Sequence, residues 1–438
     1  MLHTFKIFTF GCKVNQADSA GLRQQLLKAG FWEGELAQDA DCLIINSCAV
    51  TAESVRKARQ TMRSLRRRFP KAAIVVTGCW PQAFPEDAFD GADIIVGTKE
   101  RERIPELLMA HFQCAHQEAC RAVVPYLPKG GEPFSGLTCA DTQRTRAFLK
   151  IQEGCNQFCS YCIIPYARGR CRSMPVARVA AEALQLAEQG FREIVLTGIN
   201  LGFYGIDTGE SLADAVAACA APDTICRVRL GSLEPERMDR EMLLRLAECE
   251  KFCPQFHLSL QSGSTSVLQR MRRRYDPIGY CRIVEGIRAV FPEAAITTDV
   301  IVGFPGETDA DFEKTVGMVQ KIGFAKVHIF PYSPREGTPA AAMADQISGD
   351  VKNQRAAMLA AVAAECTRQH MAGYVGRTVS VLVECKKHQN AQSFYQGHMA
   401  DGTLVKIFAE NGEKGLQNSV ICVTIEACMD DCCIAHLR

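Results

Sequence analysis

The chain has 438 residues, of which 47% are hydrophobic and 23% are charged, a mix that excludes collagen-like, disordered and low-complexity proteins. The net charge is only +1, so a nucleic-acid-binding role would have to rest on local clusters of basic residues. No apolar run approaches the ~18 residues of a membrane span, and the N-terminus lacks the pattern of a signal peptide. We therefore expect a cytoplasmic protein of about three domains.

Residues 1–111 alternate between short apolar runs and amphipathic segments. Buried parallel strands are expected at 5–10, 42–46, 73–77 and 93–96, with helices at 19–29, 53–69 and 104–111. This order predicts an N-terminal Rossmann-like α/β domain. Residues 112–146 are interrupted by Pro and Gly and are expected to form a linker.

Residues 147–372 repeat a strand–helix unit six times, which predicts a partial (β/α)6 barrel within an α/β chain. Strands are expected at 148–152, 193–197, 227–230, 256–260, 297–302 and 326–330. Helices are expected at 176–189, 212–221, 237–249, 278–290, 310–322 and 349–372. Residues 373–438 contain strand-like runs at 378–385, 403–408 and 419–426, which favour a small all-β barrel, OB-like in type.

Among the 22 cysteines, Cys155, Cys159 and Cys162 form a C-x-x-x-C-x-x-C motif directly after the first barrel strand. Three thiolates on one loop can bind three corners of a 4Fe–4S cluster, whereas full ligation by protein takes four cysteines. The open iron can then chelate S-adenosylmethionine, whose reductive cleavage yields a 5′-deoxyadenosyl radical. Structural zinc is the alternative, with Cys171 as a possible fourth ligand.

A second set consists of Cys12, Cys48 and Cys79, each of which directly follows a predicted strand. Ligands of open α/β sheets sit at the carboxyl ends of strands, so these cysteines should converge. Gly11 and Gly78 would let the backbone pass close to an inorganic group. Buried structural thiols are the alternative.

The two triplets, in this order, resemble the methylthiotransferase branch of the radical S-adenosylmethionine superfamily. The resemblance covers nearly the whole chain and includes the segments at 196–202, 229–235, 258–264, 299–307 and 330–339. Of three subgroups, segments 11–16 and 163–169 look most like the one that modifies N6-threonylcarbamoyladenosine at tRNA position 37. The alternatives are the subgroup that modifies N6-isopentenyladenosine in tRNA and the one that modifies a ribosomal-protein aspartate.

The resemblance implies two 4Fe–4S clusters and S-adenosylmethionine as cofactors. Cys155, Cys159 and Cys162 would bind the radical cluster, and Cys12, Cys48 and Cys79 an auxiliary cluster whose open iron carries the sulfur to be transferred. One S-adenosylmethionine would methylate that sulfur. A second would supply the radical that lets the methylthio group replace the hydrogen on C2 of the adenine.

The same resemblance implies further positions near S-adenosylmethionine. It places Tyr161 by the adenine through its backbone, and Gln261 and Arg335 in the pocket without a fixed role. The remaining implied contacts are Gly198, Ile199 and Asn200 by the methionine moiety, Ser232 and Glu234 by the ribose, and Val302, Gly303 and Phe304 by the adenine. For the glycines, tight strand–helix turns are the alternative.

Eight basic residues and no acidic one lie between Arg56 and Lys71. Arg56, Arg59, Arg63 and Arg66 share one helix face and could follow RNA phosphates, although a solvated face is the alternative. A shorter run comprises Arg270, Arg272, Arg273 and Arg274.

The C-terminal strands look like the TRAM domain of this family, which is implied to grip tRNA. The expected partners are therefore tRNA, through its anticodon-loop adenosine, and an electron donor such as flavodoxin or ferredoxin, but neither a membrane nor DNA. The terminal cysteines Cys428, Cys432 and Cys433 favour packing over metal binding. A non-enzymatic alternative for the whole chain is a zinc-containing RNA-binding protein.

Overall fold

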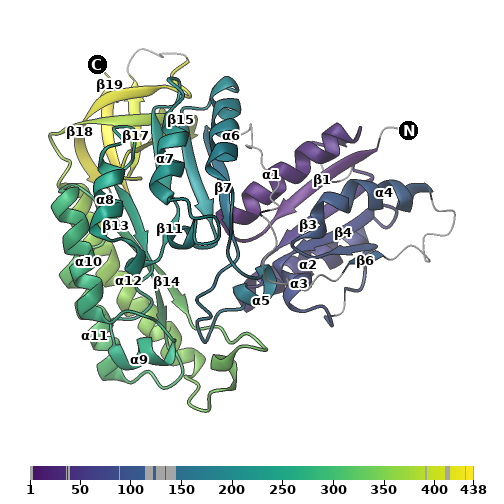
Figure 1. The fold of residues 1–438 in the computed structure, drawn as a ribbon, viewed down its shortest axis with the longest axis horizontal. Helices are drawn as coiled ribbons and strands as arrows, with labels where there is room; N and C mark the ends of the chain where they lie inside the picture. The colour runs from purple at the N-terminus through teal and green to yellow at the C-terminus, as the bar shows by residue number, and fades with distance from the viewer. Residues whose placement is uncertain are drawn as a thin grey trace.

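The computed structural model describes residues 3–35, 37, 40–87, 89–113, 122–124, 134, 145–389, 392–409, 415–429 and 431–437. Its N-terminal part is a six-stranded parallel sheet in the order β2-β1-β3-β4-β5-β6 (Figure 1). The strands are β1 (Thr4–Thr9), β2 (Trp32–Glu33), β3 (Cys42–Ser47), β4 (Ala73–Gly78), β5 (Ile94–Val96) and β6 (Ala122–Val124). The helices are α1 (Lys13–Lys28), α2 (Ala52–Arg68), α3 (Cys79–Ala83) and α4 (Ile104–Gln113).

The predicted elements of this sheet are confirmed, but β2 and α3 were not predicted, and two further differences concern α1 and β6. Helix α1 begins at Lys13 and not at residue 19. Its first turns carry polar residues, and Asn15 and Asp18 are buried, so the apolar periodicity that usually marks a helix is missing there. Within the stretch expected as a linker, Ala122–Val124 pairs with β5 and extends the sheet.

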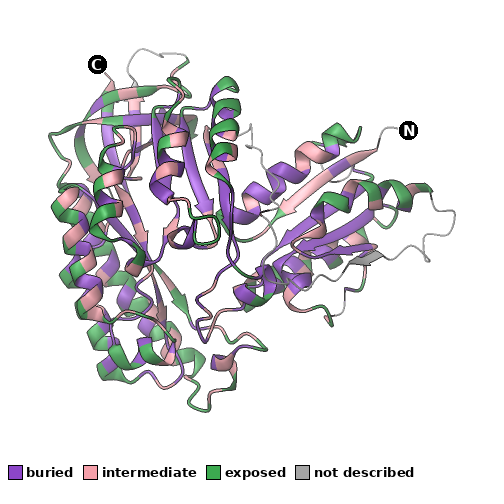
Figure 2. Ribbon diagram, viewed as in Figure 1, coloured by how far each residue is buried: buried purple, intermediate pink, exposed green. Residues whose placement is uncertain are grey.

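The central part contains the six expected strands in sequence order, curved into a partial barrel with helices outside (Figures 1 and 2). Parallel pairing joins β7 to β9 and β9 to β10, and likewise β12 to β13 and β13 to β14. The two halves meet where the Val228 amide donates to the Lys251 carbonyl at 2.8 Å. The strands are β7 (Arg146–Glu153), β9 (Glu193–Gly198), β10 (Arg227–Leu230), β12 (Gln255–Leu258), β13 (Ala295–Val302) and β14 (Lys326–Pro331).

Amphipathic helices cover this barrel, and their buried faces form one continuous core with the strands (Figure 2). They are α6 (Val176–Glu188), α7 (Leu212–Ala220), α8 (Arg240–Ala247), α10 (Pro277–Val290), α11 (Asp309–Ile322) and α12 (Gly349–Ala372). Four short elements were not predicted: α5 (Ile164–Arg168), β8 (Arg172–Ser173), β11 (Ser232–Leu233) and α9 (Thr265–Arg270). They lie beside the ends of the barrel strands. Each has too few residues for a periodic pattern to predict it.

The C-terminal part is a closed five-stranded barrel in the order β15-β16-β17-β19-β18. Its strands are β15 (Thr378–Gln389), β16 (Gln392–Met399), β17 (Leu404–Ala409), β18 (Val420–Met429) and β19 (Cys432–Leu437). It docks against the first residues of the central strands: Arg227 donates to the carbonyls of His398 and Ser380 at 2.9 and 2.7 Å. Within the described residues, no helix combines the length and apolar character needed to cross a membrane.

A buried group of charges joins the N-terminal sheet to the central barrel, and we call it the interface network. It comprises Asp18 and Arg101 of the N-terminal part with Lys150, Glu153 and Arg168 of the barrel. Asp18 pairs with Arg101 at 2.5 Å, with Arg168 at 3.2 Å and with Lys150. All five side chains are at most 7% exposed.

Asp18 pairs with three cations, which come from both domains. Removing its charge should therefore weaken the contact between the domains. We expect Asp18→Asn to lower the free energy of unfolding by about 3–5 kcal/mol, because it leaves buried cations without their counter-charge. Calorimetric melting at neutral pH should show a lower Tm than the wild type. The matched control is Glu53→Gln, which removes an exposed carboxylate that pairs with Arg56; equal melting of both variants would contradict the expectation.

Candidate functional site

The structure brings Cys12, Cys48 and Cys79 together at the carboxyl edge of the N-terminal sheet. They follow β1, β3 and β4, which are adjacent strands in the sheet. The three sulfurs interact electrostatically with one another. Burial raises the pKa of Cys48 to about 12 and also raises the pKa of Cys79, so each thiol is a buried donor that a metal group would deprotonate.

Two glycines and one asparagine shape this N-terminal triplet. Gly11 has φ +109°, and a Cβ there would lie 2.7 Å from the Cβ of Cys48. Gly78 has φ +104°, and a Cβ would lie 2.3 Å from the Ser47 carbonyl oxygen. The buried Asn15 amide donates to the carbonyls of Phe10 and Ser47 at 2.7 and 3.0 Å, which ties together the loops that carry Cys12 and Cys48.

The barrel triplet of Cys155, Cys159 and Cys162 lies on the loop between β7 and α5. The loop is closed by a hydrogen bond from the Cys155 amide to the Gly169 carbonyl at 3.0 Å. Phe158 has φ +50°, an unusual conformation for a bulky residue and a sign of local constraint. Burial raises the pKa of all three thiols, that of Cys155 to about 11.

A chain of polar side chains encloses the barrel triplet. Asn200 donates to Cys155 Sγ at 3.9 Å and to Glu234 Oε2 at 2.8 Å. Arg273 pairs with Glu234 and donates to Cys159 Sγ at 3.2 Å. Burial raises the pKa of Glu234 to about 7, against the opposing effect of Arg273.

The remaining expected cofactor positions surround the same mouth of the barrel. Gly198 ends β9 and Ile199 follows it, and Ser232 follows β10 on β11. Tyr161 packs edge-on against Phe304, with ring centroids 6.3 Å apart. Val302 ends β13, and Gly303, with φ +70°, donates its amide to Glu307 at 2.6 Å.

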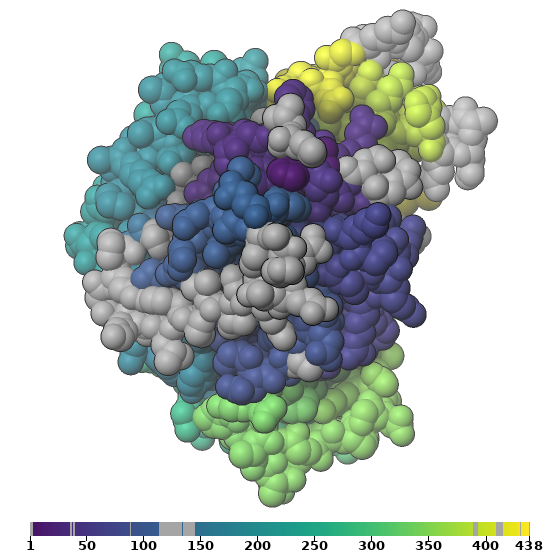
Figure 3. Space-filling model, turned by 90° about the vertical axis from the view of Figure 1, so that its right-hand side faces the viewer, coloured from purple at the N-terminus to yellow at the C-terminus, as the bar shows by residue number. Residues whose placement is uncertain are grey.

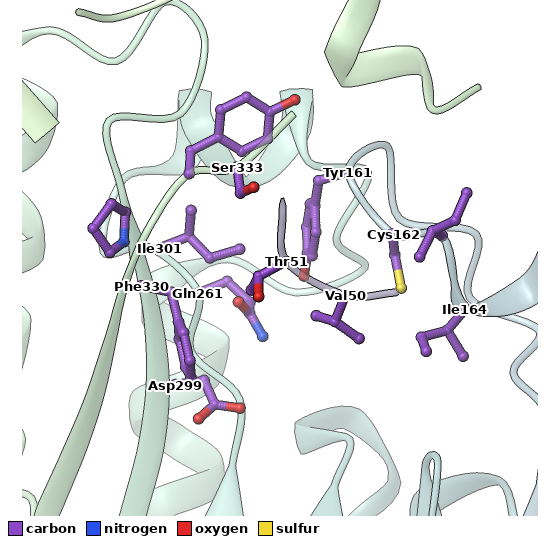
Figure 4. Close-up of a pocket in the computed structure, with 13 residues that line it drawn as sticks. Val50, Thr51, Tyr161, Cys162, Ile164, Gln261, Asp299, Ile301, Phe330 and Ser333 are labelled. Carbon is purple, nitrogen blue, oxygen red and sulfur yellow. The ribbon is translucent and has the colours of Figure 1, made fainter. Parts of the chain in front are cut away.

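A cavity of about 190 Å³ lies between the two triplets (Figure 4). Val50 and Thr51 contribute to its wall from the loop after Cys48, next to Tyr161 and Cys162 from the loop of the barrel triplet (Figure 4). The expected pocket residue Gln261 also lines it. The other lining residues are Ile163, Ile164, Asp299, Ile301, Phe330, Pro331, Tyr332 and Ser333.

A groove of about 420 Å³ is lined by Arg56, Arg59 and Arg63 of α2 and by Arg335 from the segment after β14. Three of the arginines expected to contact RNA meet here with Arg335, which was expected in the pocket and does not line the cavity, and we call this place the basic groove. In the space-filling view the N-terminal part covers the barrel, and the chain after β14 protrudes directly below it (Figure 3).

The structure corrects the expectation that the α2 arginines carry uncompensated charge. Arg56 pairs with Glu53 at 2.7 Å and Arg59 with Asp87 at 2.9 Å. Arg66 pairs with Asp93 and donates to three backbone carbonyls, those of Gly91, Pro70 and Ala72, so it anchors the sheet and lies outside the basic groove. The acidic partners lie outside the run that was read from the sequence.

Two arginines of the short basic run at 270–274 have partners within the protein. Arg273 is 3% exposed and belongs to the chain around the barrel triplet, not to a surface. Arg270 donates to the Gly306 carbonyl at 2.7 Å. Cys171, the candidate fourth zinc ligand, is buried and interacts electrostatically with Cys155.

Three positions escaped the sequence reasoning. Arg168 donates to Cys79 Sγ at 3.2 Å from the helix that follows the barrel triplet, and thus touches both halves of the site. Lys13, directly after Cys12, interacts electrostatically with charged groups on four barrel strands. Asn15 holds the cysteine loops. All three lie in segments 11–16 and 163–169, where polar residues next to cysteines were the available signal.

Comparison with known proteins gives two family matches: residues 149–319 match the Radical SAM superfamily, and residues 4–97 match the uncharacterized protein family UPF0004. The chain is 38% identical over 388 residues to the threonylcarbamoyladenosine tRNA methylthiotransferase MtaB of Thermotoga maritima, covering 87% of each chain. It is 35% identical over 411 residues to the tRNA-2-methylthio-N(6)-dimethylallyladenosine synthase of Clostridium novyi, covering 92% of this chain and 90% of the relative.

A solved structure shares the fold: the radical S-adenosylmethionine methyltransferase TsrM of Kitasatospora setae with cobalamin and a [4Fe-4S] cluster bound. It has a TM-score of 0.56 and 16% sequence identity, and the match covers 78% of this chain and 77% of that one.

The separation of the two triplets predicts that each binds iron independently. Replacing Cys155, Cys159 and Cys162 by Ala should remove about half of the iron from anaerobically reconstituted protein, since each set offers ligands for one 4Fe–4S cluster. Replacing Cys12, Cys48 and Cys79 should remove the other half. Iron analysis measures both, with the exposed Cys226→Ala as the control that keeps full iron content; loss of all iron from either triple variant would contradict independence.

Proposed function

The chain belongs to the radical S-adenosylmethionine methylthiotransferase family, and we propose that it transfers a methylthio group to C2 of N6-threonylcarbamoyladenosine at position 37 of tRNA. It is an enzyme that uses S-adenosylmethionine and 4Fe–4S clusters. The observation that supports the proposed reaction is the cavity whose walls come from the loops of both cysteine triplets. A base in this cavity would lie between the two cofactor sites.

The residues present fit the cofactors. Each triplet offers three thiols, which leaves one iron of a bound cluster free for another ligand. Asn200 Oδ1 is buried and has no hydrogen-bond partner among the described residues, although the amide nitrogen of the same side chain contacts Cys155 and Glu234. An acceptor in this position suits the ammonium group of S-adenosylmethionine.

Each of the two domains would hold one of the clusters. We propose that residues 1–111 hold the auxiliary cluster through Cys12, Cys48 and Cys79, and that residues 147–372 hold the radical cluster through Cys155, Cys159 and Cys162. The bound cofactors supply the electron-transfer, radical and sulfur-transfer chemistry that side chains lack. The protein positions them: the interface network fixes the two domains, and Arg273 and Asn200 orient the barrel triplet.

The polypeptide also excludes water from the reacting position. Tyr161, Phe304 and Tyr332 form an aromatic cluster at the barrel mouth. Val50 and Ile163 add apolar surface to the cavity. A dry cavity protects a radical step from side reactions. An electron-donor protein of the flavodoxin or ferredoxin type is part of the proposal, because reductive cleavage of S-adenosylmethionine consumes an electron.

We infer that tRNA is gripped by two parts of the molecule. The C-terminal domain, residues 373–438, is a closed five-stranded barrel, in keeping with an OB-like TRAM domain. The basic groove lies at the N-terminal end of α2, next to the loop of Val50 and Thr51 that lines the cavity. Position 37 would have to be flipped from its stack to enter the cavity. A tRNA substrate places the reaction in the cytoplasm.

Nucleoside mass spectrometry of tRNA from cells with and without the gene tests the reaction. We expect the methylthio form of threonylcarbamoyladenosine to disappear without the gene while the unmodified nucleoside accumulates. Loss of methylthio-isopentenyladenosine instead would show that the enzyme catalyses the same reaction on a different nucleoside. No change in tRNA would overturn the tRNA assignment and direct the search to ribosomal proteins.

Charge reversal in the basic groove tests the tRNA surface. Arg63 is exposed in the groove, and no ion pair involves it among the described residues, so Arg63→Glu should weaken tRNA binding several-fold and reduce its salt dependence by about one charge. Fluorescence anisotropy at several salt concentrations measures both. Lys321→Glu on α11, on the far side of the barrel in Figure 1, is the control. Equal tRNA binding by the two variants would show that the groove does not contact tRNA.

A further inference from the structure

Lys13 occupies an unusual place for the first residue of a helix. It begins α1 directly after Cys12, and its ammonium group interacts electrostatically with charged groups on β7, β9, β10 and β13. The charge of Lys13 also acts on His328 of β14. Because these groups belong to five strands of one barrel, the N-terminal domain brings the charge of Lys13 to the lumen that these strands surround.

The other charges in this part of the lumen are already paired. Arg229 pairs with Glu193 at 2.9 Å, and Arg146 pairs with Glu384 at 2.7 Å. No hydrogen bond or ion pair joins Lys13 to any residue in the part of the chain that the structure describes. Lys13 is also accessible to solvent. It is therefore a solvent-accessible cation without an ion-pair partner among the described residues.

The side chains beside Lys13 favour an anionic occupant over a metal ion. The ligand atoms of His257, Asp299 and His328 lie within 4.8 Å of one another, which by itself would suit a divalent cation. However, His257 already pairs with Asp299 at 3.1 Å, and His328 lies near the charges of Lys13 and Lys326. These positive neighbours repel a cation and attract a carboxylate.

One residue relates this part of the barrel to the cavity between the triplets. Asp299, which lies within electrostatic range of Lys13, also lines that cavity together with Cys162 and Gln261 (Figure 4). An adenine that presents C2 to the cofactor sites can direct its N6 substituent past Asp299 toward Lys13. A threonylcarbamoyl arm ends in a carboxylate and a hydroxyl group, whereas an isopentenyl arm has only carbon and hydrogen.

We propose that Lys13 is a specificity-determining residue that binds the carboxylate of the N6 substituent of the substrate adenosine. This inference rests on the proposed function. A charge-assisted hydrogen bond in a confined site selects the acidic arm, because the uncharged arm would leave the ammonium group unpaired. The histidines and Asp299 supply partners for the hydroxyl and ureido groups.

The test compares binding of three synthetic anticodon stem-loop RNAs to the full-length, cluster-reconstituted protein. The first carries threonylcarbamoyladenosine, the second its uncharged threoninamide analogue, and the third isopentenyladenosine. We expect the wild type to bind the first about 10- to 100-fold more tightly than the second. Lys13→Met should bind these two RNAs equally, and Lys13→Arg should restore much of the preference.

Lys28→Met, at the exposed end of the same helix, is the matched control and should retain the wild-type preference. Iron content and the visible absorption spectrum show that each variant keeps its clusters, since Lys13 adjoins Cys12. Equal binding of the first two RNAs by the wild type, or an unchanged preference in Lys13→Met, would overturn the assignment of Lys13. If the wild type instead methylthiolated only the isopentenyladenosine RNA, the proposed function itself would fail, and the assignment would fail with it.

Discussion

The buried ion pairs between the N-terminal sheet and the central barrel are the constraint on which the site depends. Burying charges is costly unless each is paired, so a network of five such side chains is stable only when both domains supply their members. Asp18 receives cations from both sides, namely Arg101 from its own domain and Lys150 and Arg168 from the barrel. The domains are therefore held in one register, and the two cysteine triplets are held at one separation.

The same network extends electrostatically to the cysteines. It contains three cations and two carboxylates, and therefore one positive charge in excess. Of its cations, Arg168 lies next to Cys79, whose sulfur accepts a hydrogen bond from it. Burial raises the pKa of Cys79, while the guanidinium of Arg168 opposes this effect and favours a thiolate. Since Arg168 ends the helix that follows Cys162, one short element sets the position of both triplets. A structural interaction thus also prepares one triplet for metal ligation.

The sequence alone predicts the parts of the fold in which apolar residues follow a regular pattern. The six central strands follow from buried apolar runs, and the convergence of Cys12, Cys48 and Cys79 follows from their place after adjacent parallel strands. It was insufficient where polar groups are buried by distant partners. The pairing of Arg66 with Asp93 and the burial of Arg273 depend on tertiary contacts that charge patterns along the chain do not encode. The early start of α1 was missed for the same reason, because its buried residues are polar.

The placement of the C-terminal domain completes the argument about access. It covers the amino ends of the barrel strands, where Arg227 and Arg229 donate to carbonyls of Ser380, His398 and Met399. The C-terminal domain thus borders the amino end of the barrel, while the cavity lined by the loops of both triplets lies at the carboxyl end. A substituent that extends from the cavity toward the amino end would pass Asp299, which lines the cavity, and would approach Lys13 as proposed. If residues 373–438 hold the RNA as proposed, the same domain also borders the end of the barrel that lies beyond the residues proposed to select the substituent.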